Sequence, residues 1–111
     1  MNVQIFGSKK SFDSKKAERW FRERRIPYQY VDLLKKGLSP GEYRSVRARL
    51  SFEDLVDTEC HAYRDLYMEY ITREAAEEKL AEHPELLRAP IVRNGKFATV
   101  GYAPEVWETW E

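Results

Sequence analysis

The chain has few of the residues that hold small proteins together through covalent bonds or metal ions. Cys60 is the only cysteine among 111 residues, so an internal disulfide and a cysteine-cluster metal site are both excluded. His61 and His83 are the only histidines, which offers too few partners for a zinc site. Stability must therefore come from a hydrophobic core, which a chain of this length can bury without such staples.

The sequence also lacks a long apolar run. No stretch approaches the roughly 20 apolar residues that a membrane-spanning helix needs, and the first residues form no apolar signal core. We therefore expect a soluble, cytoplasmic protein with no membrane partner.

A net charge is absent as well, because 19 Lys and Arg residues balance 19 Asp and Glu residues. The charges are unevenly distributed: residues 1–50 carry 13 basic against 5 acidic side chains, and residues 51–111 carry 6 against 14. This asymmetry is a weak indication of a basic face. Solvated charge pairs spread over the surface are the simpler explanation, because halves of a sequence seldom coincide with faces of a fold.

The sequence does contain an ordered series of strand and helix signals. Residues 2–6 alternate and then stop at Gly7, which is typical of a buried strand. Ser11 is a candidate N-cap for the next helix, and apolar residues follow it at helical spacing. These residues are Ala17, Trp20 and Phe21. Pro27 ends the helix, and residues 26–32 predict a second strand parallel to the first.

The middle of the chain, about residues 38–83, predicts a helical insertion. Capping boxes at residues 39–42 and 51–54 begin two short helices. A third helix is expected over residues 63–70 and a fourth over residues 72–82.

Strand signals return near the end of the chain. The segments APIV (89–92) and FATV (97–100) flank Asn94-Gly95, a strong hairpin signal because both residues tolerate a positive φ. Pro104 then opens a last helix. Four aromatic residues at helical spacing in the first and last helices are expected to pack on the sheet. They are Trp20, Phe21, Trp107 and Trp110.

The order of these elements predicts the fold. A β-α-β unit, a helical insertion and a β-β-α unit indicate an α/β protein with a thioredoxin-like fold and a four-stranded mixed sheet. A single domain over residues 1–111 is expected from the length. Pro90 stands just ahead of the third strand, where this fold places a cis-proline beside its active site.

Three segments also resemble a known family. The opening QIFGSKKSFDSKKAERWF, the segment DLLKKGLS and above all the tail EHPELLRAPIVRNGKFATVGYAPEVW are similar to the arsenate reductase ArsC and to Spx-type proteins. The resemblance extends from about residue 2 to residue 110 and includes the insertion. It implies a bacterial cytosolic protein and, in the ArsC branch, an oxidoreductase that reduces arsenate with glutathione and glutaredoxin.

The residues at the family's catalytic position depart from its pattern. The resemblance places the family's catalytic cysteine at Ser11, in the loop before the first helix. Spx-type proteins often have a second cysteine three residues later, where this chain has Ser14 and arsenate reductases already have serine. The reactive pair of the family therefore reads S-x-x-S here.

The positions of the family's other functional side chains differ too. In the arsenate-reductase branch, a histidine stands at the position of Gly7 and an arginine at the position of Lys15. The family usually has an arginine immediately before the cis-proline, and this chain has Ala89 there, with Arg88 one residue away. An arginine of the family's insertion aligns near Asp57. An arginine of the tail falls near residues 101–103. Of the reactive and oxyanion-binding pattern, only Ser14 and a cation at position 15 remain in place.

Several interpretations of the serine remain open. Thiol chemistry at Ser11 is excluded for this sequence, because a serine hydroxyl is a weak nucleophile and cannot cycle between thiol and disulfide. Ser11 could be a hydrolytic nucleophile with His61 or His83, but no G-x-S-x-G elbow supports that, and a helix N-cap is the simpler role. Cys60 could supply a thiol instead, or it could be a small buried hydrophobe. Ser11 could also be an engineered replacement for a native cysteine.

Basic residues around the start of the first helix are candidates for binding a small anion such as phosphate, sulfate or the carboxylate of glutathione. The predicted anion-binding set is Lys9, Lys10, Lys15, Arg88 and Pro90. The alternative is that these lysines only keep the loop soluble. Direct nucleic-acid binding is not expected, because free stacking groups are not obvious beside them.

The sequence therefore predicts a non-catalytic binding or regulatory module of the ArsC/Spx family. For the Spx branch, the resemblance implies RNA polymerase as a partner. The alternative is an arsenate reductase-like oxidoreductase whose cysteine was replaced or whose sulfur comes from glutathione. No cofactor is expected beyond glutathione as a co-substrate. Self-association through a sheet edge or the basic helix is a third hypothesis.

Overall fold

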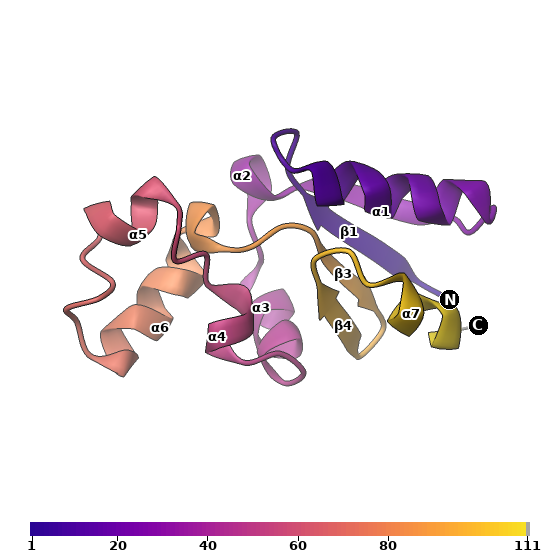
Figure 1. The fold of residues 1–111 in the computed structure, drawn as a ribbon. Helices are drawn as coiled ribbons and strands as arrows, with labels where there is room; N and C mark the ends of the chain where they lie inside the picture. The colour runs from indigo at the N-terminus through magenta and orange to yellow at the C-terminus, as the bar shows by residue number, and fades with distance from the viewer. Residues whose placement is uncertain (111) are drawn as a thin grey trace.

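The computed structural model describes residues 1–110 and shows a mixed four-stranded sheet extended by a cluster of short helices (Figure 1). Glu111, the last residue of the predicted domain, lies outside the described residues. The strands are β1 (Val3–Gly7), β2 (Tyr28–Asp32), β3 (Ile91–Asn94) and β4 (Phe97–Val100). The helices are α1 (Phe12–Glu23), α2 (Leu33–Lys36), α3 (Pro40–Arg47), α4 (Phe52–Leu55), α5 (His61–Asp65), α6 (Arg73–Glu82) and α7 (Pro104–Trp107), with 3-10 turns η1 (Pro84–Leu86) and η2 (Glu108–Trp110). The predicted order of elements is confirmed, and none of the helices within residues 1–110 is long and apolar enough to cross a membrane.

The first third of the chain forms the predicted β-α-β unit. β1 and β2 pair in parallel, with Val3 opposite Tyr28. Ser11 caps α1 as predicted, because its Oγ accepts a hydrogen bond from the backbone N–H of Ser14 at 3.1 Å. The predicted inward face of α1 is also confirmed as buried, and consists of Ala17, Trp20 and Phe21.

The last third forms the predicted hairpin. β3 pairs antiparallel with both β1 and β4, so the strand order is β2-β1-β3-β4. The turn lies one residue later than the Asn94-Gly95 signal suggests: Asn94 pairs with Phe97, and Gly95, with φ of 60°, is the first of two central residues. Asn94 belongs to the strand because it also pairs with Val3 of β1, which sets the register from outside the hairpin.

The helical insertion between β2 and β3 is well capped. The capping boxes predicted at residues 39–42 and 51–54 are both present, and Thr72 caps α6. The predicted helix over residues 63–70 is wrong in its bounds, because α5 begins at His61 and ends at Asp65. Tyr67 has a φ of 56°, and the N–H of Met68 bonds back to the carbonyl of Tyr63 at 3.1 Å. The chain turns here because Met68 must reach the core, where its side chain is only 6% exposed.

Two hydrophobic clusters hold the fold together, one on each side of the sheet. In the first, Trp20 and Phe21 of α1 meet Trp107 of α7 edge-on or tilted, with ring centroids 5.4 and 5.0 Å apart. Trp107 is fully buried and donates its Nε1–H to Thr99 Oγ1 at 2.8 Å. The second cluster joins Phe6 of β1 to the insertion helices. The insertion is therefore packed against the sheet at the end where β1 stops and α1 begins.

Candidate functional site

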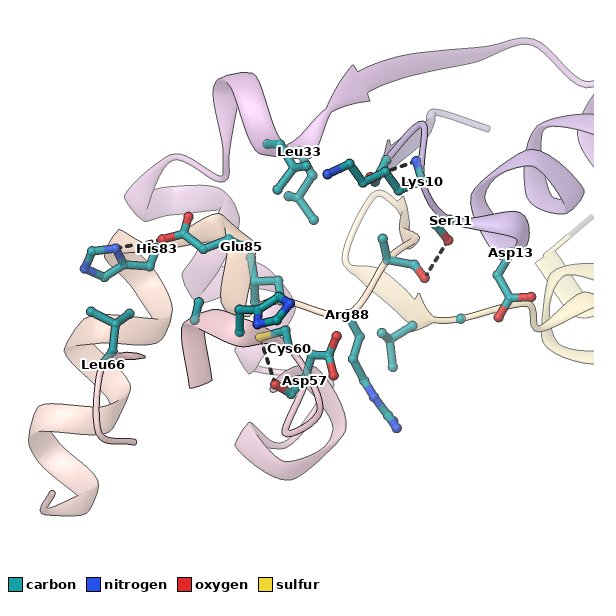
Figure 2. A pocket seen from close by; sticks show the side chains of 18 of the residues that line it. Lys10, Ser11, Asp13, Leu33, Asp57, Cys60, Leu66, His83, Glu85 and Arg88 are labelled. Carbon is teal, nitrogen blue, oxygen red and sulfur yellow. Dashed lines mark hydrogen bonds and ion pairs between the residues drawn. The ribbon is translucent and has the colours of Figure 1, made fainter. Parts of the chain in front are cut away.

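A groove of about 850 Å³ lies where the start of α1 meets the helical insertion (Figure 2). One wall comes from the loop and first turn at residues 8–13. The other comes from α2, the α4–α5 region, η1 and the segment at residues 87–89. Ser11 and Ala89 both line this groove, so it is the place at which the sequence predicts a site.

Ser11 joins the start of α1 to the segment before β3. Its Oγ donates a hydrogen bond to the carbonyl of Ala89 at 3.3 Å, across 78 positions of the chain. The same oxygen accepts the bond from Ser14 N, so the hydroxyl serves as donor and acceptor at once. The Ala89–Pro90 peptide is cis, which confirms the prediction of a cis-proline beside the first helix.

Ser14 lies behind the site. Its side chain is buried, with 1% exposure, and does not line the groove. Its Oγ accepts a hydrogen bond from the N–H of Ser8 at 3.1 Å, which closes the loop between β1 and α1. Ser14 therefore positions this loop and does not face a ligand in the groove.

The predicted anion-binding residues are only partly brought together. Lys10 and Arg88 line the groove, whereas Lys9 and Lys15 do not. The Nζ of Lys15 lies 5.8 Å from the centroid of the exposed Phe12 ring. Pro90 is fully buried, and Figure 2 shows the guanidinium of Arg88 pointing away from Ser11.

Carboxylates outnumber cations around the groove. Its acidic lining residues are Asp13, Asp57, Asp65 and Glu85, against Lys10 and Arg88. Asp57, near the place of a family arginine, is held firmly: its N–H bonds to Leu86 O at 2.8 Å, and its Oδ1 accepts from Glu59 N at 2.9 Å. Because like charges repel most strongly where water is displaced, this lining does not favour an oxyanion.

Both histidines line the groove, but neither activates Ser11. His61 Nδ1 lies 3.2 Å from Arg64, and His83 Nδ1 lies 3.0 Å from Glu85. The two bonds of the Ser11 hydroxyl go to backbone groups instead. The arrangement does not provide the base that a serine nucleophile needs.

The thiol of Cys60 also lines the groove. It is half-buried, and its Sγ donates to the carbonyl of Asp57 at 3.1 Å. It packs against the core cluster of the insertion, as a small hydrophobe would. Within residues 1–110, no group of three or more His, Cys, Asp or Glu side chains is arranged to hold a metal ion.

The apolar part of the groove was not predicted from the sequence. Leu33 of α2 and Leu66, just after α5, line it beside Leu87. The run Leu33-Leu34 directly after β2 is a signal that could have indicated an apolar site wall. The side of the fold that these residues face depends on how the insertion packs, which no local pattern reveals.

The sheet topology and the helix start beside a cis-proline define a protein of the thioredoxin-like class. The model of the ArsC family matches residues 6–110. The chain therefore belongs to the ArsC family.

Individual relatives agree with this assignment. The sequence is 28% identical over 107 residues to the Global transcriptional regulator Spx 2 of Oceanobacillus iheyensis, covering 92% of this chain and 78% of that protein. An ArsC family related protein from Bacteroides fragilis superposes with a TM-score of 0.82 at 22% identity, covering 100% of this chain and 98% of the other. An arsenate reductase from Vibrio cholerae also gives 0.82 at 22% identity, over 96% and 94% of the two chains. The two structural matches show the fold and carry no activity over to this chain.

Proposed function

We propose that this chain is a binding module of the ArsC/Spx family that does not perform thiol redox chemistry at position 11. The observation that carries the proposal is the bonding of Ser11. Its hydroxyl caps α1 and ties that helix to Ala89, beside the cis-proline. The resemblance assigns the reactive thiol of the family to this position.

The chemistry of oxygen supports this proposal. Reduction of arsenate in the family starts with a thiolate, which a helix N-terminus and nearby cations stabilise. A serine hydroxyl is not ionised under these conditions and has no disulfide form. A neighbouring base could activate it for acyl transfer, but both imidazoles lie against other side chains.

The surroundings of Ser11 support the proposal that the chain departs from the reactive pattern of the family at more than one residue. A side chain at Gly7, where the arsenate-reductase branch has histidine, would meet Tyr30 and Ser14 at 2.9 to 3.0 Å. Asp57 brings a negative charge into the groove near the place of a family arginine. A single engineered change of cysteine to serine would not produce these features.

We further propose a regulatory role in the bacterial cytoplasm through a protein partner. The similarity to an Spx-type transcriptional regulator supports this role, and RNA polymerase is the partner that the resemblance implies. The apolar wall of the groove, which includes Leu33 and Leu87, offers a protein segment a surface that a small oxyanion would not use.

An arsenate reduction assay with glutathione and glutaredoxin tests the proposal. We expect no turnover above background from the protein or from its Cys60→Ala variant, with an established arsenate reductase as the positive control. Turnover that survives Cys60→Ala would overturn the proposal.

Thiol titration of the Ser11→Cys variant separates this proposal from the alternative of a reductase with a replaced cysteine. We expect a pKa within about one unit of the ordinary value of ~8.5, because Asp13 and Asp57 offset the helix N-terminus and Lys10. A pKa far below that value, together with arsenate turnover by the variant, would favour the reductase.

A further inference from the structure

A second hollow lies at the far end of the helical insertion. It has a volume of about 520 Å³ and lies between the α4–α5 connection and the turns after α5. Cys60 and His61 line both this hollow and the groove, so the two cavities adjoin. Its other lining residues include three tyrosines and two glutamates, Tyr63, Tyr67, Tyr70, Glu59 and Glu69. We refer to it as the tyrosine hollow.

The outer tyrosines are displayed to solvent by a well-anchored turn. The side chains of Tyr67 and Tyr70 are 65% and 81% exposed. The N–H of Tyr67 bonds to Arg64 O at 3.0 Å, and the N–H of Tyr70 bonds to Tyr67 O at 2.9 Å. Between them, the buried Met68 fixes the turn to the core. The backbone that carries the two rings is therefore held in place, while the rings themselves lie outside the core clusters.

Such rings are suited to binding a protein. Tyrosine supplies a large and rigid contact area, and it is enriched among the residues that dominate binding energy at protein interfaces. Tyr63 is half-buried, packs against the core of the insertion and lines the hollow together with the two exposed tyrosines.

The segment that carries the tyrosine hollow is rich in acidic residues. Residues 52–85 contain eleven Asp and Glu residues but only three Lys and Arg residues. Within residues 1–110, Glu59 and Glu69 form no ion pair, whereas the one cation of the lining, Arg64, lies against His61. The faces of aromatic rings attract cations, and the surrounding field steers them to the site.

We propose that the tyrosine hollow is a docking site for a basic segment of a partner protein, with a lysine or arginine side chain held against the rings of Tyr67 and Tyr70. The apolar stem of such a side chain would pack on the rings while its charge approaches Glu59 and Glu69. The volume exceeds that of one side chain, which leaves room for the residues beside it. Nucleic acid is disfavoured, because its phosphates would meet the same negative field.

This docking proposal deepens the proposed function and rests on the chain being a binding module. Different experimental results would overturn the docking proposal and the proposed function. Arsenate turnover would overturn the proposed function without changing the affinity for a basic peptide. The proposed occupant is a segment of a different protein. The basic helix α1 lies toward the opposite end of a molecule 44 Å long, so it does not reach the hollow of its own copy (Figure 1).

Fluorescence anisotropy with a labelled tetra-arginine peptide tests the proposal. We expect saturable binding that weakens with added salt, no binding of tetra-glutamate, and about tenfold weaker binding by the Tyr67→Ala/Tyr70→Ala variant. The Tyr67→Phe/Tyr70→Phe variant keeps the ring faces and is expected to bind within about threefold of the unchanged protein. Circular dichroism confirms that each variant is folded.

Charge variants provide a matched control. Glu59→Gln/Glu69→Gln is expected to weaken peptide binding several-fold, whereas Glu105→Gln/Glu108→Gln, which changes two exposed carboxylates in α7 and η2, is expected to have little effect. Equal binding by the unchanged protein and the tyrosine-to-alanine variant would overturn the proposal. Sedimentation that shows self-association lost in that variant would also overturn it, because the hollow would then belong to a second copy.

Discussion

Gly7 and Tyr30 exclude any side chain larger than hydrogen at the end of β1. A Cβ added to Gly7 would lie 2.9 Å from Cε2 of Tyr30, a separation that real Cβ atoms essentially never show. It would also lie 3.0 Å from Cβ and Oγ of Ser14, which α1 holds in place. The space next to Gly7, the position at which the resemblance places a histidine in the arsenate-reductase branch, is therefore filled by Tyr30 and Ser14.

We predict that Gly7→Ala lowers the free energy of unfolding by about 1–3 kcal/mol, because the added methyl group overpacks a closed site. Urea denaturation measures this change. Gly41→Ala is the matched control, since the nearest atom to its added Cβ would be the mobile end of Arg44 at 3.9 Å. That control is expected to be neutral or to stabilise by up to about 1 kcal/mol. An equal effect of both substitutions would contradict the packing explanation.

Ser11 is predicted to act as a helix cap with a measurable effect on stability. Ser11→Ala removes the acceptor for Ser14 N and the donor to Ala89 O, and we expect a loss of about 1 kcal/mol. Ser11→Asp keeps an acceptor for Ser14 N and is expected to retain most of the cap. Thermal unfolding compares the two variants. Full stability of Ser11→Ala would show that the hydroxyl is free for another role.

Glu77 is predicted to make the protein sensitive to acid. Arg47 bonds to both its carboxylate oxygens, at 2.8 and 3.3 Å, and these bonds lower the pKa of Glu77 below its ordinary value against the opposing effect of burial. A depressed pKa stabilises the fold above the unfolded-state value of 4.5, and this stabilisation is lost as the pH falls through the folded-state pKa.

The Glu77→Gln variant tests this link between pH and stability. We expect it to lose about 1–2 kcal/mol at pH 7, a moderate value because the pair is partly exposed, and to differ much less from the unchanged protein at about pH 3. Denaturation at both pH values gives the comparison. Glu78→Gln, on the exposed neighbour in α6, is the control. A pH-independent difference for Glu77→Gln would contradict the assignment.

Tyr43 is predicted to ionise unusually late. Burial, together with the nearby Glu77 that accepts its hydroxyl hydrogen at 3.1 Å, raises the pKa of Tyr43 to about 12. The folded protein keeps this proton between about pH 10 and 12 while the unfolded chain releases it, so stability falls with rising pH over that range. The absorbance difference between the unchanged protein and Tyr43→Phe should show a tyrosinate transition near pH 12. A transition near 10 would contradict the prediction.

Signals that act over three or four residues predicted the local structure well. The cap at Ser11 and the capping boxes at residues 39–42 and 51–54 are present because each needs only a side chain and a nearby N–H. Where distant contacts decide the structure, the predicted bounds of elements were off by a few residues. The end of α5 follows from the burial of Met68, and the hairpin turn follows from the pairing of Asn94 with β1.

The candidate site divides in the same way. The cis-proline at position 90 and its approach to the first helix follow from the predicted order of elements. Which cations line the groove could not be predicted, because Lys9 and Lys10 are neighbours in one loop and only Lys10 lines it. The exposure of Tyr67 was not predicted, because a helix was expected over residues 63–70 where the chain instead forms a turn.

The sequence by itself determined the order of strands and helices, the cap on the first helix and the presence of oxygen instead of sulfur at position 11. These features depend on residue identity and on contacts between near neighbours in the chain. Only the tertiary structure decided that Asp57 and the other carboxylates share a groove with Ser11, and that the rings of Tyr67 and Tyr70 stand clear of the core. Such placements arise when distant segments pack around a common core, and the position of each depends on all the others.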